Sequence, residues 1–423
     1  MKMIFKMLKR GVNVGLLVIL VMLLSYSSMA FAVGQVEIFS WWTGGGEEEG
    51  LNAIYEVFKS EYPDVEIINA TVAGGAGTNA KAVLKTRMIG GNPPDSFQVH
   101  GGMELTDTYV VTGKMESLTA HLKEWGIYDK FPADIMEICS YEGEVYSIPV
   151  NVHRGNVLFI NKEILDKVGI SSVPGNWPEF IETLKKIKAA GYVPLSLGDK
   201  NKWTATHLFE TILLSTMGPY NYNGLWNGRV NFSYQGVKDA LDILLELMDY
   251  VNDDHAALTW QDATLMVFEG KAAFNVMGDW AEGYLKTLGW TPGKEFNWMT
   301  VPGTKGAFMI VTDTFGLPKG TPNRENALKW LKIVASVEGQ DAFNPIKGSI
   351  PARLDADKSL YDIYLTWSMN DFATNALCPS IIHGSAAPEG FTTALNDALN
   401  IFIAEKDISA TLNSIQNAAK DYL

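Results

Sequence analysis

The chain has 423 residues, with 34 lysines and arginines against 48 aspartates and glutamates, and only two cysteines. A formal net charge of −14 argues against nucleic acid or anionic lipid as a partner, because both require a basic face. A disulfide framework is excluded as well, and we expect Cys139 and Cys378 to be buried free thiols rather than a bonded pair.

The first 32 residues are typical of a signal peptide. Four basic residues among the first ten precede an apolar run over 12–24, and Ala30-Phe31-Ala32 follows. The apolar run is shorter than the roughly 20 residues that a membrane-spanning helix needs. We therefore expect export, cleavage near Ala32 and a soluble periplasmic protein, with an uncleaved anchor as the alternative. Cleavage would move the formal charge from −14 to −18.

From residue 33 onward, strand and helix patterns alternate. Residues 36–39 and 65–67 predict strands, whereas 51–58 and 80–88 carry the apolar spacing of amphipathic helices. Further helices are expected over 181–187, 237–248, 328–335 and 394–402. Thr321 and Pro322 are expected to cap and open the third of these. The alternation indicates an α/β fold with parallel strands, and the length exceeds that of a single core, so we expect two lobes.

The loop from Trp41 to Glu49 is the strongest candidate for ligand contact, because it joins a strand to a helix at the edge where α/β sheets bind ligands. Glycines at 44–46 let a ligand approach the backbone, but glutamates at 47–49 would repel a phosphate. A neutral, hydroxyl-rich ligand fits better. At least one of Trp41 and Trp42 is expected to face a cleft or a lobe boundary, and packing of both under loops is the alternative.

Sugars present one face of C–H bonds and a rim of hydroxyls. Their sites combine flat aromatic rings with carboxylate, amide and imidazole groups. Such groups stand in further predicted loops at Gln98 and His100, at Trp260, and at Asp279 beside Trp280.

Little in the sequence points to a metal or to catalysis. The six histidines form no i, i+4 pair and have no cysteine partner, so we predict neither a metal nor a cofactor. No Gly-x-Ser-x-Gly motif is present. The enzymatic alternative that stays open is an exported glycoside hydrolase that uses two carboxylates, for example Glu47 and Asp279.

At this point the chain resembles a known family, the extracellular solute-binding proteins of ATP-driven (ABC) sugar importers, and within it the glucose/mannose-binding branch. The similarity extends over essentially the whole mature chain. The segments that carry it lie at residues 38–42, 69–77, 97–100, 149–154, 225–228, 270–280, 315–320, 343–353 and 383–384.

The resemblance implies a type II periplasmic binding protein-like fold, in which two discontinuous α/β lobes are joined by a three-segment hinge near 148–151, 312–315 and 347–350. Lobe 1 would comprise residues 33–149 and 313–348, and lobe 2 residues 150–312 and 349–423. The positions that match the family's ligand contacts are Trp41, Trp42, Glu47, Gln98, His100, Trp226, Trp260, Asp279, Lys347 and His383.

Four qualifications accompany that set. Glu48 is an alternative to Glu47, and Asn151 and His153 are second-rank candidates beside the hinge. Core packing is favoured for Trp280, and an ion pair between the lobes is the alternative for Lys347.

The function that the resemblance implies is capture of a monosaccharide, glucose before galactose or mannose, by hinge closure. A monomer would then deliver the sugar to an ABC transporter permease, with no catalytic residue and no cofactor. Besides the hydrolase, a sugar sensor for a receptor remains an alternative.

Overall fold

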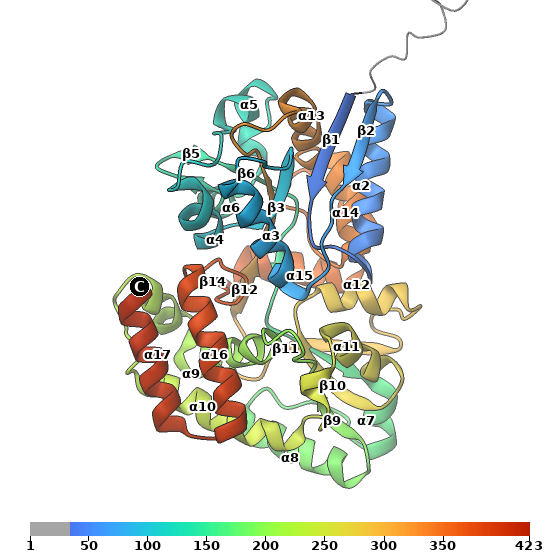
Figure 1. The fold of residues 1–423 in the computed structure, drawn as a ribbon. Coiled ribbons are helices and arrows are strands. Elements are labelled where there is room, and N and C mark those ends of the chain that lie inside the picture. The colour runs from blue at the N-terminus through green and yellow to red at the C-terminus, as the bar shows by residue number, and fades with distance from the viewer. Residues whose placement is uncertain (1–33) are drawn as a thin grey trace, which may run out of the picture.

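Two lobes, each built around its own β-sheets, make up residues 34–423, the part of the chain that this computed structural model describes (Figure 1). The predicted signal peptide, residues 1–32, lies outside the described residues. The mixture of sheets and covering helices in two lobes confirms the predicted fold class.

A five-stranded mixed sheet forms the centre of lobe 1, the upper lobe in Figure 1. Its strands run in the order β2 (Val65–Asn69), β1 (Gly34–Phe39), β3 (Ser96–His100), β13 (Asp313–Gly316) and β6 (Ser147–Pro149). β1 is parallel to β2 and β3, whereas β13 is antiparallel to β3 and β6. β13 therefore returns late in the sequence to pair with strands of the N-terminal part, and lobe 1 is discontinuous.

Helices from both parts of the chain cover this sheet. They are α2 (Glu47–Glu61), α3 (Thr78–Ile89), α4 (Met103–Leu105), α5 (Thr119–Glu124), α6 (Ala133–Ile138), α13 (Arg324–Val334) and α14 (Val337–Lys347). The small hairpin β4 (Ser140–Tyr141) and β5 (Glu144–Val145) also belongs here. α14 packs along α2, and α13 packs on β1, so the late segment is part of the same lobe.

Two smaller sheets form lobe 2. The first has the order β11 (Phe296–Thr300), β8 (Val157–Asn161), β10 (Ala272–Met277) and β9 (Val193–Ser196). The second has the order β14 (Ala376–Pro379), β12 (Ala307–Val311) and β7 (His153–Arg154). Only β9–β10 and β12–β14 are parallel pairs in the described part of this lobe. A hydrophobic core of its own, with members only between residues 158 and 418, holds most of lobe 2 together.

The helices of lobe 2 are α7 (Lys162–Val168), α8 (Trp177–Ala189), α9 (Thr204–Trp226), α10 (Gln235–Leu247), α11 (Trp260–Phe268), α12 (Trp280–Thr287), α15 (Ile363–Thr374), α16 (Glu389–Glu405) and α17 (Ile408–Tyr422). α9 is kinked at Gly218, which has a φ of 68° and precedes Pro219. The kink lets α9 pack on both α10 and α16.

Three chain segments cross between the lobes and lie side by side. They are the connections β6 to β7, β12 to β13, and α14 to α15. The N–H of Val150 donates to the carbonyl of Asp313 at 3.0 Å, and Val152 and Ile350 exchange two backbone hydrogen bonds of 2.8 and 3.0 Å. The crossovers are thus hydrogen-bonded to one another.

Most elements expected from periodicity are present, and one predicted helix start is wrong. α13 begins at Arg324, with Asn323 and not Thr321 at its N-cap position. The Thr321 hydroxyl donates instead to the carboxylate of Asp95, which also accepts the N–H of Asn323 at 2.8 Å. A buried carboxylate on the neighbouring segment therefore displaces the local cap.

Candidate functional site

A small cavity, with a volume of about 30 Å³, lies where the two lobes meet. Its lining comes from both lobes. The lining residues are Trp41, Trp42, Glu47, Ala76, His100, His153, Trp203, Trp260, Trp280, Val311, Asp313, Lys347 and His383. Five tryptophans in one small cavity give it unusually flat, apolar walls, interrupted by charged and imidazole groups.

The chain places these tryptophans at element ends. Trp41 and Trp42 follow β1, whereas Trp203 precedes α9, and Trp260 and Trp280 are the first residues of α11 and α12. All five are at most 6% exposed, and Trp42 is 2% exposed. Side chains at such ends project beyond the sheet toward the opposite lobe, which is why both lobes contribute rings.

Asp313, the first residue of β13, is the polar centre of the cavity wall. Its Oδ1 accepts from Nε2 of Gln98 at 2.8 Å, and its Oδ2 accepts from Nδ2 of Asn151 at 2.9 Å. Nε2 of His153 lies 3.2 Å from Oδ2. Burial would raise the pKa of Asp313, but the hydrogen bond and charge of His153, with His100 and Lys347 nearby, hold it below its usual value. The buried carboxylate is therefore ionised and compensated.

His153 joins Asp313 to a second buried carboxylate, Asp279. Its Nδ1 pairs with Oδ1 of Asp279, whose Oδ2 accepts the backbone N–H of Arg154 at 2.9 Å. Burial lowers the pKa of His153, but the charge of Asp279 and the interactions with both Asp279 and Asp313 together outweigh burial, so that the pKa is raised. Both oxygens of Asp279 are thus occupied within the protein.

Glu47 and Lys347 form an ion pair on another wall. Nζ of Lys347 donates to Oε1 of Glu47 at 2.9 Å and lies 5.8 Å above the ring of Trp42. Burial raises the pKa of Glu47, and the charge of Lys347 offsets part of that rise. Because α2 and α14 pack together in lobe 1, this is a pair within one lobe. The alternative of a pair between the lobes for Lys347 is wrong.

His100 is held by a buried carboxylate behind it. Its Nδ1 lies 2.9 Å from Oε2 of Glu104, which also pairs with Nζ of Lys81 at 2.7 Å. The ring of His100 contacts that of Trp41, with centroids 5.0 Å apart. Glu104 thus orients the imidazole, and Nε2 is left on the side of Asp313, 3.7 Å from Oδ1.

A pH dependence of stability follows from Glu104. Burial would raise its pKa, but Lys81 and His100 lower it from 4.5 to about 2. A carboxyl whose pKa is depressed on folding stabilises the protein above pH 4.5, and that contribution is lost as the pH falls from 4.5 toward 2. We expect about 3 kcal/mol to be lost over this range.

Urea unfolding at a series of pH values between neutral and about 2 measures this loss. Glu104→Gln should flatten the acid limb, whereas Glu61→Gln, at an exposed position, should leave it unchanged. Identical acid limbs for the wild type and Glu104→Gln would contradict the assignment.

Seven of the ten residues named from the sequence line the cavity. They are Trp41, Trp42, Glu47, His100, Trp260, Lys347 and His383. Gln98 and Asp279 lie directly behind the wall, where they hold Asp313 and His153. Glu48, the alternative to Glu47, is exposed on the surface.

Trp226 is the exception, because the structure places it outside this cavity, contrary to the prediction. It ends α9 and packs edge-on against Tyr222, Phe232 and Phe391. It lines a different, open groove near the C-terminus, together with Met103 and Tyr422. The kinked helix α9 thus carries its end to this separate groove and not to the cavity that Trp41 lines.

Three lining residues escaped the sequence analysis or were misjudged. Trp203 was not singled out, although it stands in a polar loop ahead of a helix as Trp260 does. Core packing was favoured for Trp280, and its ring does belong to the buried core, but it also lines the cavity and contacts His383, with centroids 5.0 Å apart. Asp313 was treated only as hinge, although a charge inside the apolar run 307–317 was a signal for a buried functional carboxylate.

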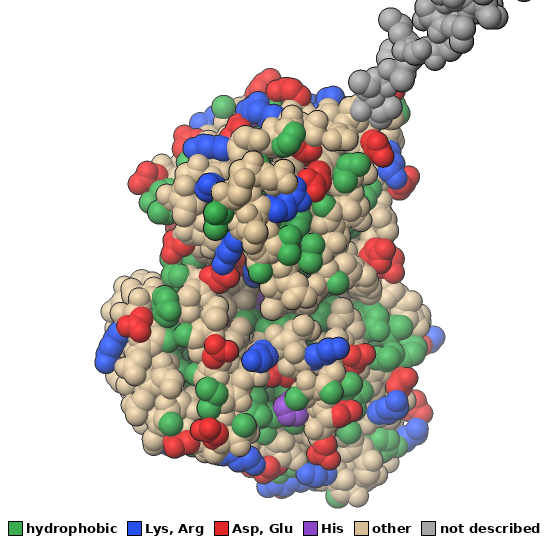
Figure 2. Space-filling view, viewed as in Figure 1, with side chains coloured by type: hydrophobic (Ala, Val, Ile, Leu, Met, Phe, Trp, Pro, Cys, Tyr) green, Lys and Arg blue, Asp and Glu red, His purple; other side chains and the backbone are tan. Residues whose placement is uncertain are grey.

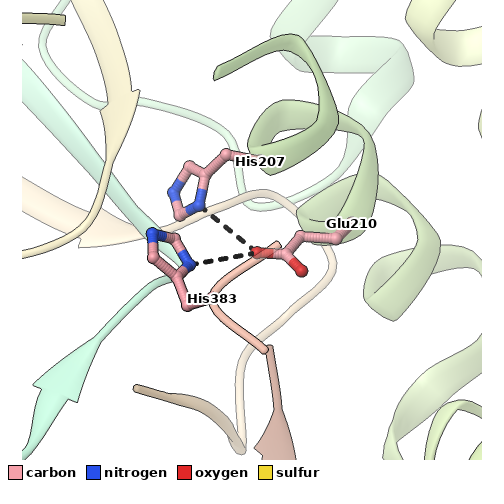
Figure 3. Close-up of side chains that lie close together, drawn as sticks. All are labelled: His207, Glu210 and His383. Carbon is pink, nitrogen blue, oxygen red and sulfur yellow. Dashed lines mark ion pairs between the residues drawn. The ribbon is translucent and has the colours of Figure 1, made fainter. Parts of the chain in front are cut away.

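Behind His383 lies a buried cluster of possible metal ligands, shown in Figure 3. His207, Glu210 and His383 each offer an atom, and these atoms lie within 4.8 Å of one another. A search of the sequence for histidines at i, i+4 could not find this cluster, because His383 reaches α9 from a loop far along the chain. Glu210, however, already accepts three hydrogen bonds: from the Ser380 hydroxyl and from the N–H groups of Ile381 and Ile382.

The surface and the helices bear on the kind of partner. Acidic and basic side chains are scattered singly over the face drawn in Figure 2, without a continuous patch of one sign. Within residues 34–423, no helix is both long and apolar enough to cross a membrane.

Comparison with known proteins gives one consistent answer. Residues 40–341 match the family model described as bacterial extracellular solute-binding protein. An uncharacterized ABC transporter extracellular-binding protein of Pyrococcus horikoshii is 38% identical, over 92% of this chain and 88% of its own. A probable sugar-binding periplasmic protein of Mesorhizobium japonicum is 34% identical, over 90% and 91%.

Two further likenesses are more distant. The glucose-binding protein GlcS of Saccharolobus solfataricus is 28% identical over 74% of this chain and 59% of its own. Among solved structures, a chitin oligosaccharide binding protein superimposes with a TM-score of 0.81 at 18% identity, and covers 92% of this chain and 98% of that chain. This last likeness shows the fold.

Proposed function

Because the chain belongs to the bacterial extracellular solute-binding proteins, we propose that it captures a neutral monosaccharide in the cavity between its lobes and delivers it to an ABC transporter permease. The observation that carries the proposal is the composition of the cavity. Five indole rings offer flat surfaces for the C–H face of a sugar, and Glu47, Lys347, His100 and His383 stand around them to bond its hydroxyls. Several relatives are themselves named as sugar-binding proteins.

Glucose is our first candidate and galactose or mannose the next, since each presents one apolar face and a complete rim of hydroxyls. The wrong epimer would leave a buried polar group unpaired, at about 1–3 kcal/mol for each group.

Capture by closure of the lobes about the three crossovers explains how both lobes contribute to one site. We place the boundaries as expected from the sequence, lobe 1 at 33–149 with 313–348 and lobe 2 at 150–312 with 349–423. Membership of the five-stranded sheet supports this division. The described conformation is closed: the N–H of Glu104 donates to the carbonyl of Gly384 at 2.8 Å, and Lys85 pairs with Glu389.

Gly75→Ala is expected to hinder closure. A Cβ at Gly75 would lie 2.6 Å from Nε1 of Trp203 and 3.5 Å from Cδ1 of Trp260, both on the opposite lobe. The clash exists only when the lobes meet, so we expect sugar affinity to fall by about 5- to 150-fold, equivalent to the roughly 1–3 kcal/mol of an overpacked contact. The free energy of unfolding without ligand should hardly change.

Calorimetric titration and urea unfolding test this pair of outcomes. Gly44→Ala is the matched control, because its Cβ would meet nothing within 4 Å. Unaltered sugar affinity in Gly75→Ala would argue against closure as the capture step.

The hydrolase alternative loses its proposed carboxylate pair. A retaining or inverting glycosidase needs two carboxyl groups that face the scissile bond. Asp279 is fully buried, and both its oxygens are engaged by His153 and Arg154. Capture and release therefore fit the site better than turnover, with the monomer acting outside the cytoplasmic membrane and a permease as its partner.

The deciding experiment is isothermal titration of residues 33–423 with glucose, galactose, mannose, xylose and a set of disaccharides. Each mixture is analysed afterwards for hydrolysis. Saturable binding of an unaltered monosaccharide is the expected result. Cleavage of a disaccharide, or the absence of binding to every sugar, would overturn the proposal.

A further inference from the structure

The buried cluster behind the cavity contains hydrogen bonds that orient the imidazole of His383, one of the groups that line the cavity. His383 is 3% exposed, whereas Ser380, Glu210 and His207 are completely buried. Nδ1 of His383 lies 2.9 Å from the hydroxyl oxygen of Ser380, and that hydroxyl lies 2.8 Å from Oε1 of Glu210. The three side chains therefore form a chain of hydrogen bonds that starts at the cavity wall and ends on α9. Figure 3 shows its two ends, His383 and Glu210, lying close together.

The carboxylate of Glu210 determines which groups donate and which accept along this series of hydrogen bonds. Oε2 of Glu210 accepts the backbone N–H groups of Ile381 at 2.6 Å and of Ile382 at 3.2 Å. A carboxylate in such surroundings only accepts, so the single hydroxyl proton of Ser380 is donated to Oε1. The serine oxygen must then accept, and it does so from the backbone N–H of His383 at 3.3 Å and from Nδ1 of the same residue.

We infer that Glu210 and Ser380 are positioning residues that fix His383 in the Nδ1–H tautomer, so that its Nε2 presents a lone pair to the sugar and selects a hydroxyl that donates. In Figure 3 the second ring nitrogen of His383 points away from Glu210. The inference rests on the proposed function for the identity of the ligand, but the tautomer itself does not.

Neutrality of the imidazole supports the assignment. Burial, together with the nearby His207, His100 and Lys81, holds the pKa of His383 well below its usual value. A neutral imidazole carries one proton, and a proton on Nδ1 leaves Nε2 as an acceptor only. A ligand group that can only accept, such as a fluorine, a methyl ether or a carboxylate oxygen, would meet a lone pair there. The site would thereby favour neutral, unmodified sugars.

A metal ion is the competing explanation of the same cluster. Oε1 of Glu210 lies 3.3 Å from Nδ1 of His207 and 3.9 Å from Nδ1 of His383. The serine hydroxyl is hydrogen-bonded to both Glu210 and His383, and three donors already satisfy the carboxylate. The hydrogen-bond chain accounts for the contact between Glu210 and His383 without a cation, whereas neither ring nitrogen of His207 has a hydrogen-bond partner among the described residues.

The tautomer is read directly by two-bond ¹H–¹⁵N correlation spectra of ¹⁵N-histidine-labelled protein without ligand, with His383→Gln to identify the signal. A protonated Nδ1 and an unprotonated Nε2 are expected for His383. A protonated Nε2, or a shift of Nδ1 on addition of equimolar Zn²⁺ that is typical of a metal-bound nitrogen, would overturn the inference.

The consequence for the ligand is measured with monodeoxyfluoro analogues of the sugar that binds. At one ring position, replacement of the hydroxyl by fluorine should weaken binding to the wild type by roughly 5- to 150-fold, because the hydrogen bond to Nε2 is lost. Ser380→Ala should reduce this discrimination, and Ser380→Thr, which keeps the hydroxyl, should retain it. Ser385→Ala is the control in the same loop, because its buried hydroxyl has no hydrogen-bond partner among the described residues.

The outcomes separate the inference from the proposed function. If Ser380→Ala and the wild type discriminated equally between the hydroxyl and the fluorine, the positioning role of Ser380 and Glu210 would be overturned, even if the sugar binds normally. Failure of every sugar to bind would overturn the proposed function, while the spectra of the ligand-free protein would still report the tautomer of His383.

Discussion

Asp313→Ala is expected to lower the free energy of unfolding by about 3–5 kcal/mol, the range measured when one partner of a buried charge network is removed. The carboxylate accepts hydrogen bonds from Gln98 and Asn151, and it compensates the buried imidazole of His153. Its loss leaves two amide donors unpaired and an imidazole with one carboxylate neighbour instead of two. Because Asn151 adjoins the first crossover, we expect the crossover region between the lobes to lose its structure first.

Urea unfolding without ligand measures this effect, and Asp64→Ala, at an exposed position, is the control. Asp313→Asn should fall between the two, because the amide keeps one acceptor but turns a donor toward groups that also donate. A loss below about 1 kcal/mol for Asp313→Ala, the range of exposed ion pairs, would show that the network does not support the fold.

Trp41→Ala is expected to weaken sugar binding by roughly 30- to 1,000-fold, which corresponds to about 2–4 kcal/mol for the loss of a buried aromatic contact. The ring lines the cavity, contacts His100 and lies 5.7 Å from Nζ of Lys81, so its position is defined on three sides. Trp41→Phe keeps a flat face and should recover a large part of the affinity.

Trp226→Ala is the matched control, since it removes an indole of the same size outside the cavity. It should lower stability, because the ring packs on Phe232 and Phe391, but leave the affinity for sugar unchanged. Calorimetric titration of the three variants with the same sugar decides the matter. Equal losses in Trp41→Ala and Trp226→Ala would place the site elsewhere.

Much of the architecture could be predicted from local patterns alone. The apolar spacing of residues 51–58, 181–187 and 237–248 depends only on neighbours in sequence, and each segment is a helix with that face buried. Trp41, Trp42 and His100 could be named as well, because the ends of consecutive parallel strands meet at one edge of a sheet. Resemblance to a family added Lys347 and His383, which no periodicity distinguishes.

The tertiary structure decided what depends on contacts between distant segments. Asp313 meets Gln98 only because β13 returns to pair with β3, more than 200 residues later. Trp226 lies outside the cavity because the kinked helix α9 ends elsewhere, and Asp279 lies behind the cavity wall, where His153 and Arg154 engage its oxygens.

The sequence by itself thus determined the elements and the α/β class, since these follow from the spacing and type of neighbouring side chains, and its resemblance to a family supplied the set of expected contact residues. Only the tertiary structure decided which polar groups face the cavity and which are hydrogen-bonded to one another behind it. A buried donor or acceptor must find a partner, and the nearest partner is set by chain segments that the local pattern does not bring together.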